Sequence, residues 1–139
     1  CVGGGKFRND EIQSLQKLNI QDHLIQYDVE DNSLPYFYKN ALCLVFPSLY
    51  EGFGLPILEA FSCDCPVVCS NTSSFPEVAG DAPVYFNPYD ENSIENSVET
   101  VIYNPTIRTR LIEKGKERLK YFSWSKTASE TKKVYESIL

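Results

Sequence analysis

A pair of glutamates around a glycine-rich segment is the feature of the sequence best suited to chemistry. Glu51 and Glu59 stand eight residues apart, and Gly52, Phe53 and Gly54 follow the first of them. Glycine permits positive φ angles and lets a ligand approach the backbone closely, and the free amides at the start of a helix favour an anion. A diphosphate fits this environment, and the carboxylates remain available to sugar hydroxyl groups, each hydrogen bond being worth about 1.5–3 kcal/mol. The segment is therefore suited to a nucleotide-sugar, although for the pair taken alone the plainer interpretations below are favoured.

The same two glutamates have plainer interpretations. Glu59 could merely complement the dipole of its helix, for about 0.3–1 kcal/mol, while Glu51 is a solvated loop residue. Paired carboxylates are also the equipment of glycoside hydrolases, although hydrolysis of a neutral glycan does not require an anion-binding turn. A third alternative is a non-catalytic binding or assembly module that keeps the fold. Binding of nucleoside diphosphates separates a transferase from a hydrolase.

Short apolar runs alternate with amphipathic stretches along the chain, a pattern typical of βα units and a parallel sheet. We predict strands at 1–2, 24–27, 42–46, 66–70 and 84–86, and helices that begin near residues 10, 31, 56, 90, 105 and 123. The apolar run 42–46 suits a central strand buried on both faces. The expected fold is one α/β domain with a Rossmann-like, doubly wound parallel sheet, in which ligands bind beyond the carboxyl ends of the strands. Loops 3–8, 27–31 and 48–54 are expected to share that rim.

Length and charge limit the class of protein. The 139 residues leave room for one domain, and the net charge of -6 argues against a nucleic-acid or anionic-membrane surface made by this domain. No apolar run approaches the roughly 18 residues that span a bilayer, and no secretory leader is recognisable. The odd number of cysteines, mostly in apolar settings, indicates reduced and buried thiols in a cytoplasmic protein.

Two groups of residues raise the question of a metal ion. Cys63, Cys65 and Cys69 could supply three zinc ligands, but the single histidine, His23, is distant in the sequence and no fourth ligand is evident. The acidic set at 28–31 could hold a metal beside a nucleotide-sugar, although helix capping and simple solvation explain it better. We therefore expect no metal at either place.

The glycine run at 3–5 invites comparison with dinucleotide-binding loops. That fingerprint would place a glycine at position 8, where Arg8 stands. The run therefore does not favour a dehydrogenase.

Further matches surround the glutamate pair. The central block is Pro47 to Pro56, and shorter matches occur at Val2-Gly3-Gly4-Gly5, Leu34-Pro35 with Tyr38, Glu59-Ala60, Cys63, Pro66-Val67-Val68, Pro76-Glu77-Val78, Gly80-Asp81-Ala82 and Phe122-Ser123-Trp124. With these residues the chain resembles, almost end to end, the retaining glycosyltransferases that carry a Glu-x7-Glu motif (glycosyl transferases group 1). The part resembled is the C-terminal, donor-binding domain of their GT-B fold.

This resemblance implies a hexosyltransferase that moves a sugar from a nucleotide-sugar donor with retention of anomeric configuration. No metal or other cofactor is implied, and the leaving diphosphate would help to deprotonate the acceptor. By the same resemblance, Glu51 would make catalytic contact with the transferred sugar, and the backbone of Gly52, Phe53 and Gly54 would line the sugar and phosphate pocket. Leu55 would contact the nucleoside-phosphate junction, and Glu59 would bind the ribose hydroxyls. Val29 would contact the base through its main chain.

The resemblance also implies what lies outside residues 1–139. The family's diphosphate-binding Arg and Lys would lie upstream, and Lys6 and Arg8 are not their equivalents. The first strand and helix of this domain, and the N-terminal acceptor-binding domain, would be missing, so the isolated chain is expected to be inactive. The implied acceptor is a glycan or a lipid-linked glycan and not a nucleic acid. Polysaccharide biosynthesis in the cytoplasm, peripherally at the inner face of the membrane, would be the setting.

Two features depart from the family or stay open. Asp64 and Cys65 stand where Gly-Thr is usual in the family, and Asp64 is expected in a left-handed turn that glycine prefers. Near the end of the chain, apolar residues recur at helical spacing: Trp124, Ala128, Tyr135 and Ile138. This terminal stripe has two interpretations. Packing on the domain's own sheet is favoured, while GT-B enzymes suggest a final helix that crosses to the partner domain and leaves an apolar patch when alone.

Overall fold

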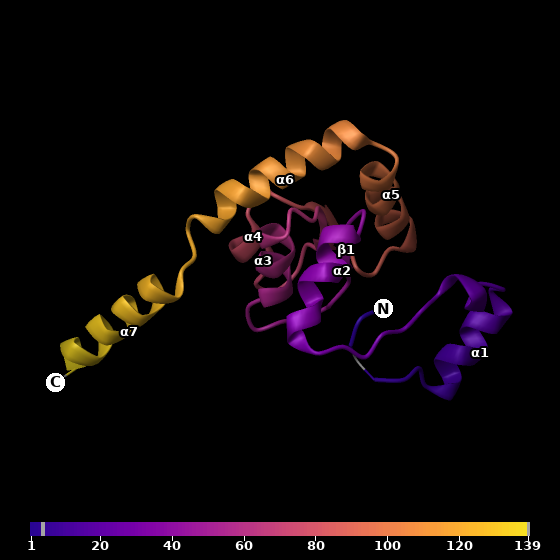
Figure 1. Ribbon diagram of the computed structural model, residues 1–139, viewed down its shortest axis with the longest axis horizontal. Helices are drawn as coiled ribbons and strands as arrows, with labels where there is room; N and C mark the ends of the chain where they lie inside the picture. Colours follow the sequence, from indigo (N-terminus) through magenta and orange to yellow (C-terminus); the bar gives the residue numbers. More distant parts are fainter. Residues whose placement is uncertain (4, 139) are drawn as a thin grey trace. The chain divides into compact units, whose positions relative to one another are not determined.

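The structure is a computed structural model that describes residues 1–3 and 5–138 of the chain (Figure 1). The chain divides into two compact units, Cys1–Leu34 and Pro35–Leu139. Gly4, part of the glycine run of the sequence analysis, lies outside the described residues.

In the described part of the Cys1–Leu34 unit, helix α1 (Asn9–Lys17) is followed by 3₁₀ turns at Gln21–His23 and Asp31–Ser33. The strands predicted at 1–2 and 24–27 are reduced to one parallel bridge between Val2 and Tyr27. Two backbone hydrogen bonds accompany it, from Gly3 N to Tyr27 O at 2.9 Å and from Tyr27 N to Cys1 O at 2.8 Å. The prediction of a strand over 24–27 is thus wrong in its extent, because its pairing with the short segment at 1–2 is confined to one bridge.

The Pro35–Leu139 unit is built on three parallel strands in the order β1-β2-β3: β1 (Leu44–Phe46), β2 (Val67–Ser70) and β3 (Val84–Phe86). Parallel neighbours need a crossover connection. Helix α3 (Leu55–Ser62) supplies it between β1 and β2, and α4 (Phe75–Ala79) between β2 and β3. Before β1 comes α2 (Leu34–Asn40).

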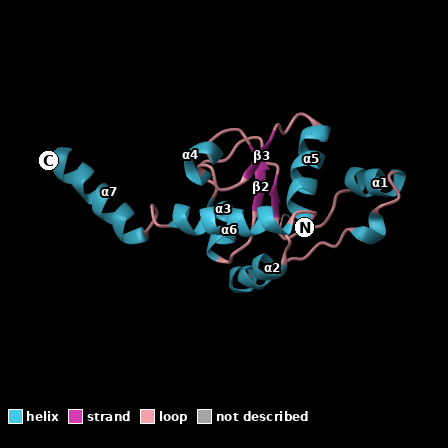
Figure 2. Cartoon of the chain, turned by 90° about the horizontal axis from the view of Figure 1, so that it is seen from above, coloured by secondary structure: helices cyan, strands magenta, loops and turns pink. Residues whose placement is uncertain are grey.

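Helices cover both faces of this sheet (Figure 2). On one face Val67 and Cys69 of β2 belong to a buried core with Ile57 of α3 and Phe75 of α4. On the other face Val68 belongs to a second core with helices α5 (Glu91–Ile102) and α6 (Pro105–Leu119). The predicted α/β fold with a doubly wound parallel sheet is therefore confirmed.

The position of one strand differs from the prediction. In the described sheet β1 pairs only with β2, and its Val45 is 40% exposed, whereas all four residues of β2 are buried. The apolar run 42–46 was expected to be central and buried on both faces. An uninterrupted apolar run reflects high burial on average, and it does not identify which strand lies between two neighbours.

Helix α6 packs very closely on α3. A Cβ atom built on Gly115 would lie 2.7 Å from Cδ1 of Phe61, which is closer than such atoms ever approach. Gly115 therefore allows the two helices to come together at a point where any side chain would collide.

Several local predictions are confirmed. The side chain of Asp90 accepts hydrogen bonds from the amides of Asn92 and Ser93 and so caps α5. Pro105 stands in the first turn of α6. Asp64 has a φ of 59°, in the left-handed region as expected.

The last helix, α7 (Trp124–Ile138), contains no buried residue. Trp124 is 80% exposed, Tyr135 67% and Ile138 76%, so the favoured prediction that this stripe packs on the domain's own sheet is wrong. Its start was predicted correctly, since Ser123 Oγ accepts a hydrogen bond from the amide of Lys126. Among the described residues, no helix combines the length and apolar character that crossing a membrane requires.

Candidate functional site

The segment from Glu51 to Glu59 runs from the loop after β1 into α3. Gly54 caps the helix with φ 99° and ψ 43°, a left-handed conformation. A Cβ atom at this position would lie 3.0 Å from the ring of Phe75, so glycine is required both by conformation and by space. Gly52 has neither constraint: its φ is not positive, and nothing lies within 4 Å of a Cβ built there. The turn therefore depends on Gly54.

Glu51 is half-buried, and its side chain and backbone are held separately. Ser48 Oγ donates a hydrogen bond of 2.9 Å to Oε1 of Glu51. The hydroxyl group of Ser73 accepts a hydrogen bond from the amide of Glu51 at 3.2 Å and donates one to its carbonyl oxygen at 2.7 Å. Among the described residues, no hydrogen-bond partner is found for Oε2 of Glu51. One carboxylate oxygen is thus fixed by the protein, and the other remains available.

The residues that follow β2 hold the whole loop, not only Glu51. Thr72 Oγ1 donates to the carbonyl oxygen of Leu49 at 3.1 Å, and Ser74 Oγ is 2.9 Å from the carbonyl oxygen of Phe53. The loops that follow two neighbouring strands, β1 and β2, are therefore hydrogen-bonded to each other. Of the three loops expected to share the rim at the carboxyl ends of the strands, only 48–54 belongs to the Pro35–Leu139 unit. The place of loops 3–8 and 27–31 at that rim stays a prediction. Thr72, Ser73 and Ser74 were not predicted as part of the site, although they form a hydroxyl-rich run directly after a predicted strand.

Glu59 is exposed on α3 and is held by a residue from another helix. The hydroxyl group of Tyr38, on α2, donates a 3.0 Å hydrogen bond to Oε2 of Glu59. Burial, followed by the hydrogen bond and the charge of Glu59, raises the pKa of Tyr38 well above its usual value. The hydroxyl group therefore stays protonated and remains a donor. The second oxygen of Glu59, Oε1, has no partner among the described residues.

Phe53 and Leu55 are partly exposed, at 43% and 48%. The ring of Phe53 meets that of Phe122, at the junction of α6 and α7, with centroids 5.9 Å apart and an interplanar angle of 84°. The guanidinium group of Arg118 lies 5.2 Å from the Phe122 centroid, and its Nε donates to the carbonyl oxygen of Val78 at 2.8 Å. The glycine-rich loop is thus connected to the end of α6 through aromatic side chains.

The structure brings together six of the seven residues named from the sequence. Within the Pro35–Leu139 unit, one continuous segment carries Glu51, Gly52, Phe53, Gly54, Leu55 and Glu59. Val29 is half-buried in the loop that follows Tyr27 in the Cys1–Leu34 unit, and is described there by itself. Its suggested contact with a base stays a prediction.

The alternative metal sites receive no support from the geometry. Within residues 1–3 and 5–138, no three His, Cys, Asp or Glu side chains gather so as to hold a metal ion. All five cysteines are free. Cys65 and Cys69 are buried as predicted, and burial raises their pKa values to about 11 and about 12. Cys1 is exposed, so the prediction of buried thiols fails there, because the bridge at Val2 leaves the terminus uncovered.

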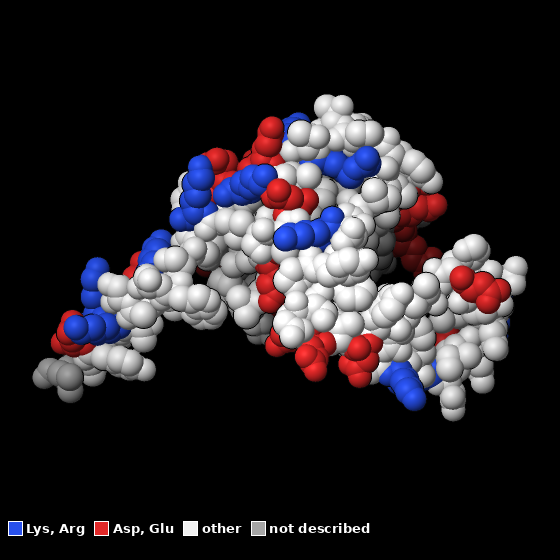
Figure 3. Space-filling view, in the orientation of Figure 1, with Lys and Arg blue, Asp and Glu red and all other residues white. Residues whose placement is uncertain are grey.

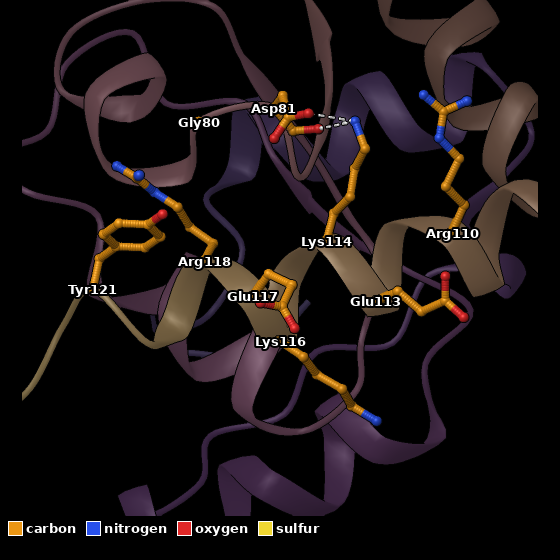
Figure 4. A pocket seen from close by; sticks show the side chains of 9 residues that line it. All are labelled: Gly80, Asp81, Arg110, Glu113, Lys114, Lys116, Glu117, Arg118 and Tyr121. Carbon is orange, nitrogen blue, oxygen red and sulfur yellow. Dashed lines mark hydrogen bonds and ion pairs between the residues drawn. The ribbon is translucent and has the colours of Figure 1, made fainter.

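A shallow groove of about 740 Å³ lies along α6, outside the glutamate segment (Figure 4). Lys and Arg side chains gather over this helix (Figure 3), but acidic side chains are interspersed among them. Lys114 is 2.5 Å from a carboxylate oxygen of Asp81, Lys116 is 3.0 Å from Asp64, and Arg118 is bonded to backbone carbonyls. Three of the four cations that line this groove are thus paired, Arg110 being the fourth, so the groove is a poor candidate for the site of an anion.

Comparison with known proteins agrees with this geometry. The model of the family described as "Glycosyl transferases group 1" matches residues 1–118. The chain is 39% identical over 132 residues to O-antigen chain mannosyltransferase B of Escherichia coli, covering 94% of the chain and 35% of that protein. It is 34% identical over 108 residues to the O-antigen chain mannosyltransferase RfbU of Salmonella typhimurium, covering 74% of the chain and 31% of that protein.

Among solved structures, a sucrose-phosphate synthase from Thermosynechococcus elongatus superposes with a TM-score of 0.85 and 26% identity, over 99% of this chain and 37% of that one. The chain therefore spans about a third of the length of each of these three proteins.

Proposed function

Because the chain belongs to the glycosyl transferases group 1 family and has the fold of the C-terminal domain of a GT-B glycosyltransferase, we propose that it binds the nucleotide-sugar donor of a retaining hexosyltransferase. The acceptor-binding domain would be supplied by the rest of a longer protein. The isolated chain would accordingly transfer no sugar.

One observation carries this proposal. Glu51 and Glu59 each have one carboxylate oxygen bound to a protein hydroxyl group, from Ser48 and Tyr38, and one oxygen without a partner among the described residues. An oriented carboxylate with a free oxygen is well prepared to accept a hydrogen bond from a sugar hydroxyl, and bonds to a charged acceptor are the stronger ones. Solvated glutamates with no further role would need no such orientation.

The turn between the two glutamates suits the diphosphate. Gly54, in its left-handed conformation, allows close approach to the backbone where α3 begins. The positive end of the helix dipole favours an anion at this place. In this arrangement Glu51 contacts the transferred sugar, Glu59 binds the ribose, and Leu55 lies at the nucleoside-phosphate junction. Gly52 and Phe53 complete the pocket with their backbone groups.

The proposed reaction needs no metal and no cofactor from this chain. The bond between the anomeric carbon and the diphosphate oxygen breaks, and the electron pair leaves with the diphosphate. The acceptor oxygen forms the new bond on the same face of the sugar, while its proton passes to the departing diphosphate oxygen. Retention of configuration follows from attack on the face that the diphosphate leaves. This chain would contribute by holding the donor groups in place, and correct orientation alone can raise a reaction rate by a large factor.

The relatives suggest the sugar and the setting. Two of them are named O-antigen chain mannosyltransferases, so we propose a mannose donor and a glycan or lipid-linked glycan as acceptor. Such a reaction would take place in the cytoplasm at the inner face of the membrane, during polysaccharide synthesis.

Calorimetric titration of the full-length protein with GDP, UDP, ADP and their sugar conjugates tests the proposal. Saturable binding of one nucleotide is expected, with a loss of affinity of roughly 10-fold or more in Glu59→Ala, since a hydrogen bond to a charged group is removed. Glu95→Ala, which removes an exposed carboxylate from α5, is the matched control and should bind normally. Full-length protein that binds none of these nucleotides would contradict a donor site and favour a glycoside hydrolase or a non-catalytic module.

The stereochemistry has its own test. The anomeric configuration of the product, read by NMR from the full-length enzyme, should equal that of the donor. An inverted product would refute the retaining mechanism while leaving the donor site intact.

A further inference from the structure

Ser73 makes a contact with Glu51 that resembles a short piece of sheet pairing. Its single hydroxyl group accepts from the amide of Glu51 at 3.2 Å and donates to the carbonyl oxygen of Glu51 at 2.7 Å. Both backbone polar groups on either side of one Cα atom are therefore tied to one side-chain atom. Such a two-point contact restricts the φ and ψ angles of Glu51, and with them the direction of its side chain.

The backbone of Ser73 is itself unusual. Its φ is 56°, in the left-handed region that residues other than glycine rarely adopt. Such a conformation costs of the order of 1–3 kcal/mol and persists only where the surroundings enforce it. Glycine would adopt it without strain, but glycine has no hydroxyl group for Glu51. The hydroxyl contact is therefore obtained at the expense of local strain.

The two glutamates are held by different parts of the chain. The backbone of Glu51 is tied to Ser73, after β2, and its carboxylate to Ser48. Glu59 lies on α3, next to the buried residue Ala60, and is held by Tyr38. Ser74 Oγ also donates to the carbonyl oxygen of Glu51, at 3.2 Å. Removal of the Ser73 hydroxyl group would free the amide of Glu51 and leave its carbonyl oxygen with that longer contact alone, while Glu59 would stay in place.

We propose that Ser73 is a positioning residue, which orients Glu51 toward the transferred sugar and takes no part in binding the nucleotide. This inference rests on the proposed function, since it needs Glu51 at the sugar and Glu59 at the ribose. Ser73 touches no reacting atom; it acts through the backbone of Glu51.

The test compares sugar transfer with nucleotide affinity in Ser73→Ala and Ser73→Gly of the full-length protein. GDP release from GDP-mannose, with methyl α-mannoside as acceptor, gives kcat, and calorimetry gives the Kd for GDP. Both variants should lower kcat roughly 10- to 100-fold, the loss that slight misplacement causes, and should leave the Kd for GDP within about twofold. A merely structural role would not separate these two quantities.

The two variants distinguish the hydroxyl group from the backbone. Ser73→Gly keeps the left-handed turn without strain, so it folds even if Ser73→Ala does not. Wild-type kcat in Ser73→Gly would overturn the proposal, because the conformation alone would then suffice. Equal losses of kcat and GDP affinity would overturn it too, since the serine would then support the whole loop. Thr100→Ala removes a 2.7 Å hydroxyl bond to the carbonyl of Asn96 on α5 and should change neither quantity.

Glu51→Ala in the same assay separates this inference from the proposed function. If Glu51→Ala abolishes transfer and the Ser73 variants do not impair it, only the role of Ser73 is refuted. If Glu51→Ala transfers normally, or if the wild-type protein binds none of the nucleotides, the proposed function fails and the inference falls with it.

Discussion

Phe53 of the glycine-rich loop and Phe122 at the end of α6 meet edge to face, with ring centroids 5.9 Å apart. This geometry places the positive edge of one ring against the negative face of the other. Arg118 adds a cation at 5.2 Å from the Phe122 centroid and also donates to the backbone of α4. The position of the loop is thus linked to the junction between α6 and α7.

Replacement of Phe122 by Ala should reduce the free energy of unfolding of the domain, because it removes a half-buried ring with two aromatic-type contacts. We expect a loss of about 1–2 kcal/mol, measured by urea denaturation. A double-mutant cycle with Phe53→Ala should give a coupling energy of about 0.5–1.5 kcal/mol. Tyr89→Ala, at a side chain that is 77% exposed, is the control and should change stability little. Additive effects of the two Phe substitutions would show that the ring contact contributes nothing.

Replacement of Tyr38 by Phe should weaken nucleotide binding without changing the fold. The substitution removes only the hydroxyl group that orients Glu59, so the Kd for the preferred nucleoside diphosphate should rise roughly 2- to 10-fold. The pKa of Tyr38 is raised above its usual value, mainly by burial, so the hydroxyl group stays protonated at about pH 10.5, where an ordinary tyrosine is mostly ionised. The ratio of the two Kd values should therefore be the same at pH 7 and at about pH 10.5. A ratio that shrinks at the higher pH would mean that the hydroxyl group ionises and no longer donates.

Replacement of Asp64 by Gly should stabilise the domain, whereas replacement by Ala should destabilise it. Asp64 has a φ of 59°, and only glycine adopts this angle without strain. Both variants lose the ion pair with Lys116, which is exposed and contributes little. The two variants should thus differ by about 1 kcal/mol in free energy of unfolding, with Gly the more stable. Equal stabilities in urea denaturation would rule out strain at this position.

The ion pair of Lys114 and Asp81 should make stability depend on pH at the acid end. The hydrogen bond and charge of Lys114 lower the pKa of Asp81 below its ordinary 3.8. The folded chain therefore holds the Asp81 proton less tightly than the unfolded chain does. The contribution of the ion pair to the free energy of unfolding is complete above the pKa of Asp81 in the unfolded chain, and it is lost as the pH falls through the pKa in the folded chain. The difference in unfolding free energy between wild type and Lys114→Met should narrow as the pH is lowered from neutral to about 3.

Lys39→Met, at an exposed lysine of α2, provides the control for that measurement. Its difference from wild type should stay constant over the same range. A constant difference for Lys114→Met as well would mean that Asp81 titrates alike in the folded and unfolded chain.

Features that depend on neighbouring residues could be predicted from the sequence. The cap at Asp90, the start of α7 after Ser123 and the left-handed turn at Asp64 are set by backbone chemistry within a few residues. The strand at β2 was equally clear from its apolar run. The spacing of Glu51 and Glu59 located the candidate site for the same reason, since one loop and the helix after it carry both.

Features that depend on distant partners could not be predicted. The bond from Tyr38 to Glu59 and the contact of Ser73 with Glu51 join segments 21 and 22 residues apart, and no local pattern reports them. The pairing of β1 with β2 alone within the Pro35–Leu139 unit depends on which strands flank it, and an apolar run does not contain this information. The exposure of α7 is of the same kind: periodicity shows that a helix has an apolar face, but not what covers that face.

The close contact of Gly115 with Phe61 has a consequence for anyone who maps this protein by systematic substitution. Every replacement at position 115 pushes α6 away from α3, and α6 carries the arginine that contacts Phe122. A scan scored by product formation would therefore mark Gly115 as intolerant, alongside the residues proposed to contact the donor. If protein abundance is measured as well, substitutions at position 115 should lower abundance and activity together, whereas substitutions of Glu51 should lower activity alone. Intolerance to substitution thus reflects the spacing of two helices at Gly115 and the chemistry of the proposed site at Glu51.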